Sequence, residues 1–513
     1  MSQVIICYFS GMFVRKKKND SGKICVQVID KSNGKYKVLH TVGSSYNEDD
    51  ISSFVKEARS WIKQYSGTIE LDFSNEDQLI HNVLENIRKH ELIGLDLLLG
   101  RIFDEIGFDK IDDPLFKQLV IYRLAYPKSK LKTTQYLRRY QQIDWSEDQV
   151  YRYLDKLYHG QKEHVQQISF NHTKKIFGNE ISVVFYDVTT LYFEIDKEDD
   201  LRKTGFSKEG KHQNPQIVLG LLVSKEGYPL AYEIFEGNKF EGHTMLPVID
   251  AFKKKFDLDQ LVIVADSGLL SNQNIEELVS KGYEFILGAR IKNEKKHVQD
   301  KILSLKLKNG QSQVVEKMGL KLIITHSDSR AKKDRANREK GLGRLEKHLS
   351  KGKLTKASIN NRGYNKYLRL DGEIKVTIDY TKFDLDSKWD GLKGYLTNAK
   401  MSKNEIIENY QHLWQIEKAF RISKTDLKIR PIYHRLKKRI EAHICIAFAS
   451  YKVYKELERQ LKIRKAEISA ETAIEIAKTI FQLELESPKS KSRIKKLLII
   501  DEEQRYLADL FNF

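Results

Sequence analysis

The chain has 513 residues, of which 40% are hydrophobic, and a formal net charge of +18 at pH 7. This length predicts three or more domains, and the hydrophobic content excludes wholesale disorder. The excess of positive charge favours a polyanionic partner, with nucleic acid as the first candidate, although a basic protein without such a partner is the alternative.

The three cysteines, Cys7, Cys25 and Cys445, are isolated and form no CxxC pair. This pattern argues against a disulfide framework and a zinc finger, and it fits a reducing cytoplasm. The apolar start of the chain is followed, not preceded, by basic residues (15–18), which is the wrong order for a signal peptide. No apolar run approaches about 18 residues, so no membrane span is expected.

Residues 1–75 read as a β-rich segment followed by a helix. Three stretches rich in β-formers, 4–9, 23–30 and 36–42, are separated by turn residues, and a helix is expected over 48–65.

Residues 76–165 have a helical pattern, in which Ser146 and Asp148 mark one helix start. Basic residues such as Arg138, Arg139 and Arg152 would suit a helix-turn-helix that reads DNA. An ordinary helical bundle explains the same pattern equally well, so both interpretations stay open.

From residue 166 to 290 the pattern alternates between strands and helices. Two apolar strands, 183–187 and 261–266, each end in aspartate, and further strands are expected at 216–224, 228–235 and 284–290. Helices are expected at 244–256 and 272–281. This order predicts a mixed α/β sheet.

A basic segment, residues 291–378, interrupts that pattern. Residues 330–356 alone hold eleven Lys or Arg against three Asp or Glu, and we expect an inserted subdomain here. The α/β pattern resumes over 379–462, with helices expected at 403–424 and 434–461. The tail, 463–513, is expected to be helical.

Three carboxylates stand out. Asp187 and Asp266 close apolar strands, and Glu417 lies on the 403–424 helix, on the same face as Tyr410 and Lys424 because these residues are spaced by sevens. Carboxylates brought together repel one another unless a cation lies between them, and hard oxygen ligands favour Mg²⁺ or Mn²⁺. Each signal is weak alone, since most such aspartates cap turns, but together with the charge of +18 they predict a metal site that acts on nucleic acid.

The motifs around these residues resemble those of the DDE transposases of bacterial insertion sequences, and in particular the insertion sequence four group. The motifs are Asp187-Val-Thr-Thr, Ala265-Asp266-Ser-Gly, Gly237-Asn238…Glu241…Thr244, Tyr395-Leu-Thr-Asn, Tyr410…Glu417…Lys424 and Arg430-Pro-Ile-Tyr-His434-Arg435. The resemblance covers roughly residues 180–460. It implies a ribonuclease-H-like core with an insertion before the final carboxylate, and two-metal cleavage of transposon ends followed by strand transfer.

The resemblance also implies roles for individual residues. Asp187, Asp266 and Glu417 would hold the metal ions, Mg²⁺ or in its place Mn²⁺, and would be catalytic. DNA contacts are expected from Tyr410, Trp414, Arg421, Lys424, His434, Arg435 and Arg439. For His434, Arg435 and Arg439, a helix start with solvated basic residues is the alternative interpretation.

One position departs from the group. Leu413 stands where the group has an arginine, and Arg421, one turn beyond Glu417, is our candidate for its replacement. Trp389 is a candidate to stack on a displaced base, but a core position explains it better. We expect His243 to be a cap or surface residue and His443 to be packed.

The sequence thus predicts a cut-and-paste DNA transposase, bacterial and nucleoid-associated. Its expected partners are the terminal inverted repeats of a transposon, target DNA and a second copy of the chain in a synaptic complex. The alternatives are a non-catalytic DNA-binding derivative of a transposase and another ribonuclease-H-like nuclease.

Overall fold

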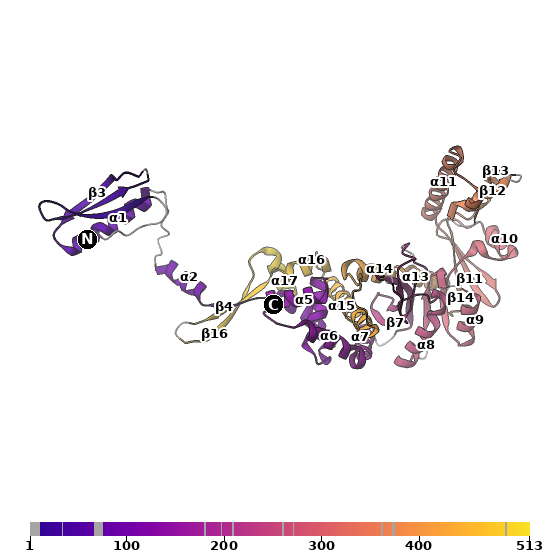
Figure 1. Cartoon of the computed structure of the whole chain (residues 1–513). Coiled ribbons are helices and arrows are strands. Elements are labelled where there is room, and N and C mark those ends of the chain that lie inside the picture. The colour runs from indigo at the N-terminus through magenta and orange to yellow at the C-terminus, as the bar shows by residue number, and fades with distance from the viewer. Residues whose placement is uncertain are drawn as a thin grey trace. The chain divides into compact units, whose positions relative to one another are not determined.

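The structure is a computed structural model, and it describes residues 11–32, 34–65, 75–178, 181–195, 197–207, 210–258, 261–269, 271–360, 363–371, 375–487 and 490–513. The chain divides into two compact units (Figure 1). The first comprises Met1–Arg88 with Glu484–Ile494, and the second comprises Lys89–Leu483 with Lys495–Phe513. Among the described residues, no helix is both long and apolar enough to cross a membrane.

The first unit contains an antiparallel three-stranded sheet covered by a helix. The strands β1 (Met12–Lys18), β2 (Ile24–Asp30) and β3 (Lys37–Ser45) lie in this order, and α1 (Glu48–Tyr65) follows, then α2 (Asn75–Glu85). Val26 and Val28 of β2 pack against Ile51, Ala58 and Ile62 of α1. The predicted strands at 23–30 and 36–42 and the predicted helix are confirmed. Strand β1 was not predicted because its basic second half resembles a solvated charge run, and the predicted strand 4–9 lies outside the described residues.

The second unit begins with a helical layer, as the pattern of residues 76–165 predicted. Its elements are η1 (Asp96–Gly100), α3 (Arg101–Ile106), η2 (Phe108–Lys110), α4 (Pro114–Ala125), α5 (Lys130–Gln141), α6 (Glu147–Lys156), η3 (Leu157–Gln161) and α7 (Lys162–Ile176). Ser146 caps α6 in a capping box, which confirms that helix start. The prediction was wrong at β4 (Ile87–Leu92), which pairs in a three-stranded sheet of order β16-β15-β4. Later in the chain, the buried helix α15 (Lys437–Ile463) packs against α4, α6 and α7.

The centre of the second unit is an eight-stranded mixed sheet, in agreement with the predicted mixed α/β class. Its order is β10-β11-β14-β9-β8-β5-β6-β7, with β8 parallel to both β5 and β9 and the other pairs antiparallel. The strands are β5 (Val183–Tyr192), β6 (Gln216–Ser224), β7 (Pro229–Glu236), β8 (Val262–Ala265), β9 (Glu284–Ala289), β10 (Ser312–Lys317), β11 (Leu320–His326) and β14 (Leu392–Thr397).

The central strands of this sheet are buried on both faces, because their side chains alternate between two apolar cores. Phe185 of β5 belongs to the core shared with α13 (Lys403–Gln411), α14 (Trp414–Arg421) and α15. Val184 and Tyr186 belong to the opposite core, which includes residues of α8 (Met245–Phe256), α9 (Asn272–Ser280) and α10 (Lys296–Ser304). Trp389 is buried in this second core, as its core interpretation predicted. Short 3₁₀ turns, η4 (Glu241–His243), η5 (Ser267–Leu269) and η6 (Ile291–Asn293), join these elements.

The segment that leaves the sheet is shorter than the expected 291–378 insertion. Strands β10 and β11 lie within that range, yet both are hydrogen-bonded into the sheet. The chain leaves only after β11, and it returns at β14, the strand paired with β11. Between them lie α11 (Asp328–Ser350), η7 (Lys356–Ser358), η8 (Gly363–Tyr367), β12 (Leu368–Asp371), β13 (Lys375–Ile378) and α12 (Tyr380–Ser387). This segment has a small core of its own, formed by Leu345, Tyr367, Leu368, Val376 and Ile378.

Two predictions in the last third of the chain were wrong. The single helix expected over 403–424 is divided into α13, α14 and the π-helical turn η9 (Ile422–Asp426), because the amides of Leu413, Gln415 and Ile416 bond three residues back instead of four. The tail is not wholly helical: α16 (Ala470–Ala477) and α17 (Glu502–Phe511) flank the strands β15 (Phe481–Glu486) and β16 (Arg493–Leu498). The alternating sequence Phe-Gln-Leu-Glu-Leu-Glu of β15 has the period of a strand, not of a helix.

Candidate functional site

The parallel pairing of β5 with β8 brings two of the three predicted carboxylates to one edge of the sheet. Tyr186 lies opposite Ala265 in this pairing, so Asp187 and Asp266 occupy the next position on neighbouring strands. Asp187 is half-buried within β5, which continues to Tyr192 instead of ending at the aspartate as predicted. Asp266 is exposed and directly follows β8. Strand register alone therefore places these two side chains as neighbours.

The third carboxylate, Glu417, comes from α14, which packs on β5 and β6. Ile416, Ala419 and Phe420 form the buried face of this helix, and Glu417 lies on its exposed side. Leu413 at the start of α14 is also buried. The apolar core thus occupies the position at which the resemblance led us to expect an arginine, and no phosphate contact is available there.

Lys393 interacts electrostatically with both Glu417 and Asp266. This half-buried lysine of β14 has a lowered pKa because burial and the nearby Arg330 disfavour its charge, while Asp266 and Glu417 act in the opposite direction. Both carboxylates therefore lie within electrostatic range of one ammonium group. The Lys393 Nζ also lies 4.5 Å from the centre of the Tyr410 ring, a cation–π distance.

Tyr410 is buried beside these groups and touches one of them. Its hydroxyl donates a hydrogen bond of 3.3 Å to Asp266 Oδ1. Burial, and then the charge of Asp266, raise the pKa of Tyr410, so the phenol stays protonated and remains a donor. Gly288 of β9 makes room for the hydroxyl, since a Cβ atom at that position would lie 2.3 Å from Tyr410 Oη.

The donor chemistry of the three carboxylates fits a divalent cation such as Mg²⁺ or Mn²⁺, which prefers oxygen ligands. Within the described ranges, however, no three His, Cys, Asp or Glu side chains are grouped closely enough to hold an ion. The edge of the sheet and α14 thus carry the three candidate carboxylate ligands, but these carboxylates do not surround one position.

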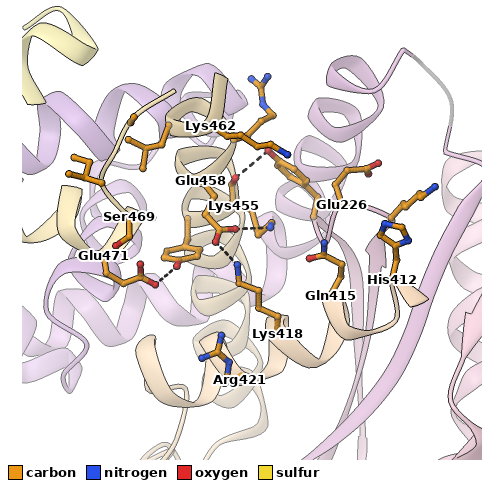
Figure 2. A pocket seen from close by; sticks show the side chains of 18 of the residues that line it. Glu226, His412, Gln415, Lys418, Arg421, Lys455, Glu458, Lys462, Ser469 and Glu471 are labelled. Atoms are coloured by element: carbon orange, nitrogen blue, oxygen red, sulfur yellow. Dashed lines mark hydrogen bonds and ion pairs between the residues drawn. The ribbon is translucent and has the colours of Figure 1, made fainter. Parts of the chain in front are cut away.

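The remaining residues expected to contact DNA fall into two groups. Trp414 and Arg421 are exposed on α14, and Lys424 lies on η9. Arg421 also lines a cavity of about 870 Å³ between α14, α15 and the start of α16 (Figure 2). The lysines of this cavity are largely paired: Glu458 accepts from Lys418 at 2.6 Å and from Lys455 at 2.7 Å.

His434, Arg435 and Arg439 form the second group, and the contacts of His434 and Arg439 are with the helical layer. Arg439 donates to Asp155 at 3.0 Å and lies over the ring of Tyr151. His434 packs edge-on against Tyr151 and His443, and burial lowers its pKa to about 4. Arg435 is exposed. His443 is buried and hydrogen-bonded to the carbonyl oxygen of Ile429, as its packed interpretation predicted.

Sequence reasoning missed three residues around the carboxylates: Lys393, Gly288 and Arg330. Lys393 stands two positions before Tyr395, the first residue of the motif Tyr395-Leu-Thr-Asn. The two-residue period of a strand places Lys393 and Tyr395 on one face of β14. That period was the available signal for Lys393. Arg330 belongs to the first turn of α11, and no local pattern connects it with the site.

Acidic side chains at one edge of a mixed sheet, next to exposed basic residues of a covering helix, suit an enzyme that acts on nucleic acid phosphodiesters. The model of the family described as "Transposase DDE domain" matches residues 178–452, more than half of the chain, and the chain belongs to this family. It is therefore a DNA transposase, and enzymes of this family use divalent metal ions.

Among solved structures, the chain is similar to the piggyBac transposase in a synaptic complex with hairpin DNA, at 9% identity, 77% coverage of this chain, 80% coverage of that chain and a TM-score of 0.37. It is also similar to the Mos1 mariner paired-end complex with Mn, at 13% identity, 35% and 56% coverage and a TM-score of 0.15. A Mos1 paired-end complex with the left transposon end gives 12% identity, 45% and 66% coverage and a TM-score of 0.16. No curated protein sequence matches the chain.

Proposed function

We propose that this transposase cuts DNA at the ends of its element in a Mg²⁺-dependent reaction and joins those ends to a target, with Asp187, Asp266 and Glu417 as the catalytic, metal-holding residues. The observation that carries the proposal is the parallel register of β5 and β8, which makes Asp187 and Asp266 neighbours beneath the helix that bears Glu417. Asp187, Asp266 and Glu417 would hold the divalent ions, which would supply activation of the attacking oxygen and stabilisation of the leaving oxygen of a phosphodiester.

The residues of the chain contribute position and charge to this chemistry. The backbone of β5 orients Asp187, whose Oδ1 accepts a hydrogen bond of 2.8 Å from the amide of Val188. Tyr410 holds one oxygen of Asp266 by donating to it, which leaves the other oxygen available to an ion. Lys393 offsets part of the negative charge of Asp266 and Glu417.

The finer assignment is to the insertion sequence four group, with a ribonuclease-H-like core. The strands β5, β6 and β7 are antiparallel, and the two strands that follow, β8 and β9, run parallel to β5. This order of strands supports that core. Arg421 and Lys424 contact the DNA backbone, and the exposed Trp414 lies along the same path. The enzyme acts in the bacterial nucleoid as a homodimer that pairs two terminal inverted repeats in a synaptic complex.

The proposal is tested with three variants, Asp187→Asn, Asp266→Asn and Glu417→Gln, and with duplexes tiled over the DNA on both sides of the reading frame. Loss of a group that only orients a metal ligand costs about 10–100-fold, so loss of a ligand should lower the cleavage rate by more than about 100-fold. Binding of terminal DNA should remain. Glu236→Gln, which changes an exposed carboxylate on β7, is the matched control and should cleave normally.

The outcomes also separate the alternatives. Cleavage retained by one of the three variants would remove that residue from the catalytic set. A wild-type chain that binds terminal DNA but never nicks it with Mg²⁺ or Mn²⁺ is a non-catalytic derivative. Nicking without strand-transfer products in the presence of target DNA would indicate another nuclease.

A further inference from the structure

Two phenylalanines are exposed on neighbouring segments of the second unit. Phe206, on the segment between β5 and β6, is 72% exposed, and Phe240, on the segment that follows β7, is 61% exposed. A single exposed apolar side chain needs no explanation, whereas apolar side chains that are exposed together mark a binding surface. The contacts of the two segments therefore decide whether these residues form such a surface.

Hydrogen bonds hold the two segments side by side. The side-chain amide of Gln216, at the start of β6, donates to the carbonyl oxygen of Phe206 at 3.0 Å and to that of Gly237 at 2.9 Å. Gly205 packs so closely on the second segment that a Cβ atom there would lie 2.4 Å from the carbonyl oxygen of Gly237. Gln216 is 1% exposed, so water does not compete for these hydrogen bonds. The backbone that carries Phe206 is thus fixed against the turn that leads to Phe240.

The second segment also lies against the end of the strand that precedes Asp266. Its turn η4 contacts η5, which begins one residue after Asp266. The side-chain amide of Asn274 joins the two turns, because it donates to the carbonyl oxygens of Gly242 and Leu269, each at 2.8 Å. The ring of Phe240 packs on η4, since a Cβ atom at Gly242 would lie 2.7 Å from Phe240 Cε1. Phe240 is therefore held next to the carboxylate site.

Basic side chains accompany the two phenylalanines. His212 and His243 lie beside the two rings, at distances between ring centres of 5.8 and 5.3 Å respectively, and both histidines are exposed. Lys211 and Lys239, their neighbours in the same segments, are exposed and form no ion pair with any other residue that the structure describes. We call this group of side chains the aromatic surface: Phe206, Lys211, His212, Lys239, Phe240 and His243.

The chemistry of the aromatic surface suits a single strand of nucleic acid. Exposed rings with basic side chains between them are the features by which proteins bind single strands of any sequence. The rings stack on unpaired bases, and the cations attract the phosphate backbone. A double helix presents only the edges of its paired bases, so exposed phenylalanines favour a strand whose bases are free. Since the chain is a DNA transposase, the strand is DNA.

We propose that the aromatic surface binds unpaired nucleotides of the DNA end that is cut, with Phe206 and Phe240 stacking on the bases. Lys211 and Lys239 attract the phosphates of the same strand. The choice of the cut end rests on the proposed function, because it takes Asp266 as part of the catalytic site. The aromatic surface thus adds contacts with bases to the backbone contacts proposed for the α14 region.

The test measures the affinity of the full-length chain for three probes. They are a blunt terminal duplex, the same duplex with a single-stranded extension at the cut end, and a third duplex whose extension is abasic. The abasic extension keeps the phosphates and lacks the bases. The wild-type chain should bind the intact extension about 5–150-fold more tightly than the abasic one, the range for stacking on one base. Equal affinity for the two extensions would overturn the proposal.

Variants of the two phenylalanines assign this preference to the aromatic surface. Phe206→Ala and Phe240→Ala should each bind the intact extension at least about fivefold more weakly, with little change for the abasic extension. Phe206→Tyr and Phe240→Tyr keep the ring and should keep the preference. Tyr506→Ala, at an exposed aromatic residue of α17, is the matched control and should bind all three probes like the wild type. Equal losses for the intact and abasic extensions in the alanine variants would overturn the stacking role.

Two further comparisons complete the test. Phe206→Leu and Phe240→Leu keep the apolar volume and lose the ring, so they should lose the preference even if the alanine variants unfold at a lower temperature. A wild-type chain that prefers the intact extension but never cuts terminal DNA would contradict the proposed function and leave the aromatic surface standing. Cleavage by a chain that shows no such preference would have the opposite meaning.

Discussion

The contact between Tyr410 and Gly288 yields a prediction that depends on the structure in detail. An alanine at position 288 would place its Cβ atom 2.3 Å from the Tyr410 hydroxyl, and 3.2 Å from the ring carbon that bears it. A carbon atom and a hydroxyl oxygen that are not bonded cannot lie 2.3 Å apart, so one of the two residues must shift. Because Tyr410 is buried, Gly288→Ala should move its hydroxyl away from Asp266.

The size of the effect follows from the hydrogen bond. A hydrogen bond to a charged group contributes about 1.5–3 kcal/mol, and the 3.3 Å distance to Asp266 favours the lower value. Tyr410→Phe should therefore slow cleavage about tenfold. Gly288→Ala should slow cleavage by about 5–150-fold, since overpacking of a filled site costs about 1–3 kcal/mol and each 1.36 kcal/mol is about tenfold in rate. In the double variant the hydroxyl that clashes is absent, so its rate should be no lower than that of Gly288→Ala alone.

The assay is single-turnover cleavage of terminal DNA at saturating Mg²⁺, with thermal unfolding of each variant as a check on folding. Gly343→Ala, at a glycine of α11 whose added Cβ would meet no atom within 4 Å, is the control and should cleave normally. If the two effects multiply in the double variant, the two residues act independently, and the role assigned to the Tyr410 hydroxyl is refuted.

Three further predictions concern charge, metal and pH. Lys393→Met removes a cation with which a metal ion must compete at Asp266 and Glu417. The Mg²⁺ concentration for half-maximal cleavage should therefore fall. A higher Mg²⁺ concentration for half-maximal cleavage would contradict this role of Lys393. Chelation by EDTA should stop cleavage and leave the Tm nearly unchanged, because Asp266 and Glu417 are exposed. Added Mg²⁺ or Mn²⁺ should restore cleavage. Unfolding of the protein by EDTA would show a structural metal instead. Burial lowers the pKa of His172 to about 3 and that of His434 to about 4, from an ordinary value of 6.5. Both are neutral when folded and gain protons on unfolding, so the free energy of unfolding should fall as the pH falls from about 6.5 toward 4, by about 1.4 kcal/mol per pH unit for each histidine. Urea unfolding across this range should show that the free energy of unfolding of His172→Gln changes with pH by about one proton less than that of the wild type. An unchanged pH dependence would contradict the lowered pKa of His172.

Much of the sheet could be predicted because its signals are local. The apolar strands that contain Asp187 or precede Asp266 needed only a run of β-formers and a parallel arrangement to become neighbours. The helix over 48–65 and the cap at Ser146 follow from amphipathic spacing and side-chain chemistry in the same way. Such features depend on a few consecutive residues, and the structure reproduces them.

The rest of the site depends on contacts between distant segments. Spacing by sevens placed Tyr410, Glu417 and Lys424 on one regular helix, but three bonds of the 3₁₀ type and the π-helical turn η9 change the rotation per residue along this stretch. The room that Gly288 leaves for Tyr410 appears only when separate elements pack together. Single-sequence patterns contain no information about this contact.

The place where the chain leaves and rejoins the sheet has a consequence for how this enzyme can be altered. His326 and Leu392 are paired partners at the ends of β11 and β14, and the amide of Ser327 donates to the carbonyl oxygen of Gly391 at 3.1 Å. The stretch between Ser327 and Trp389 therefore starts and stops at adjacent points and contains its own apolar core. A two-strand junction of this kind tolerates replacement of whatever it carries by a tight turn or by another folded module. Chimaeras made at this junction, with Trp389 retained, would exchange the α11–α12 segment between transposases without disturbing the register that positions the carboxylates.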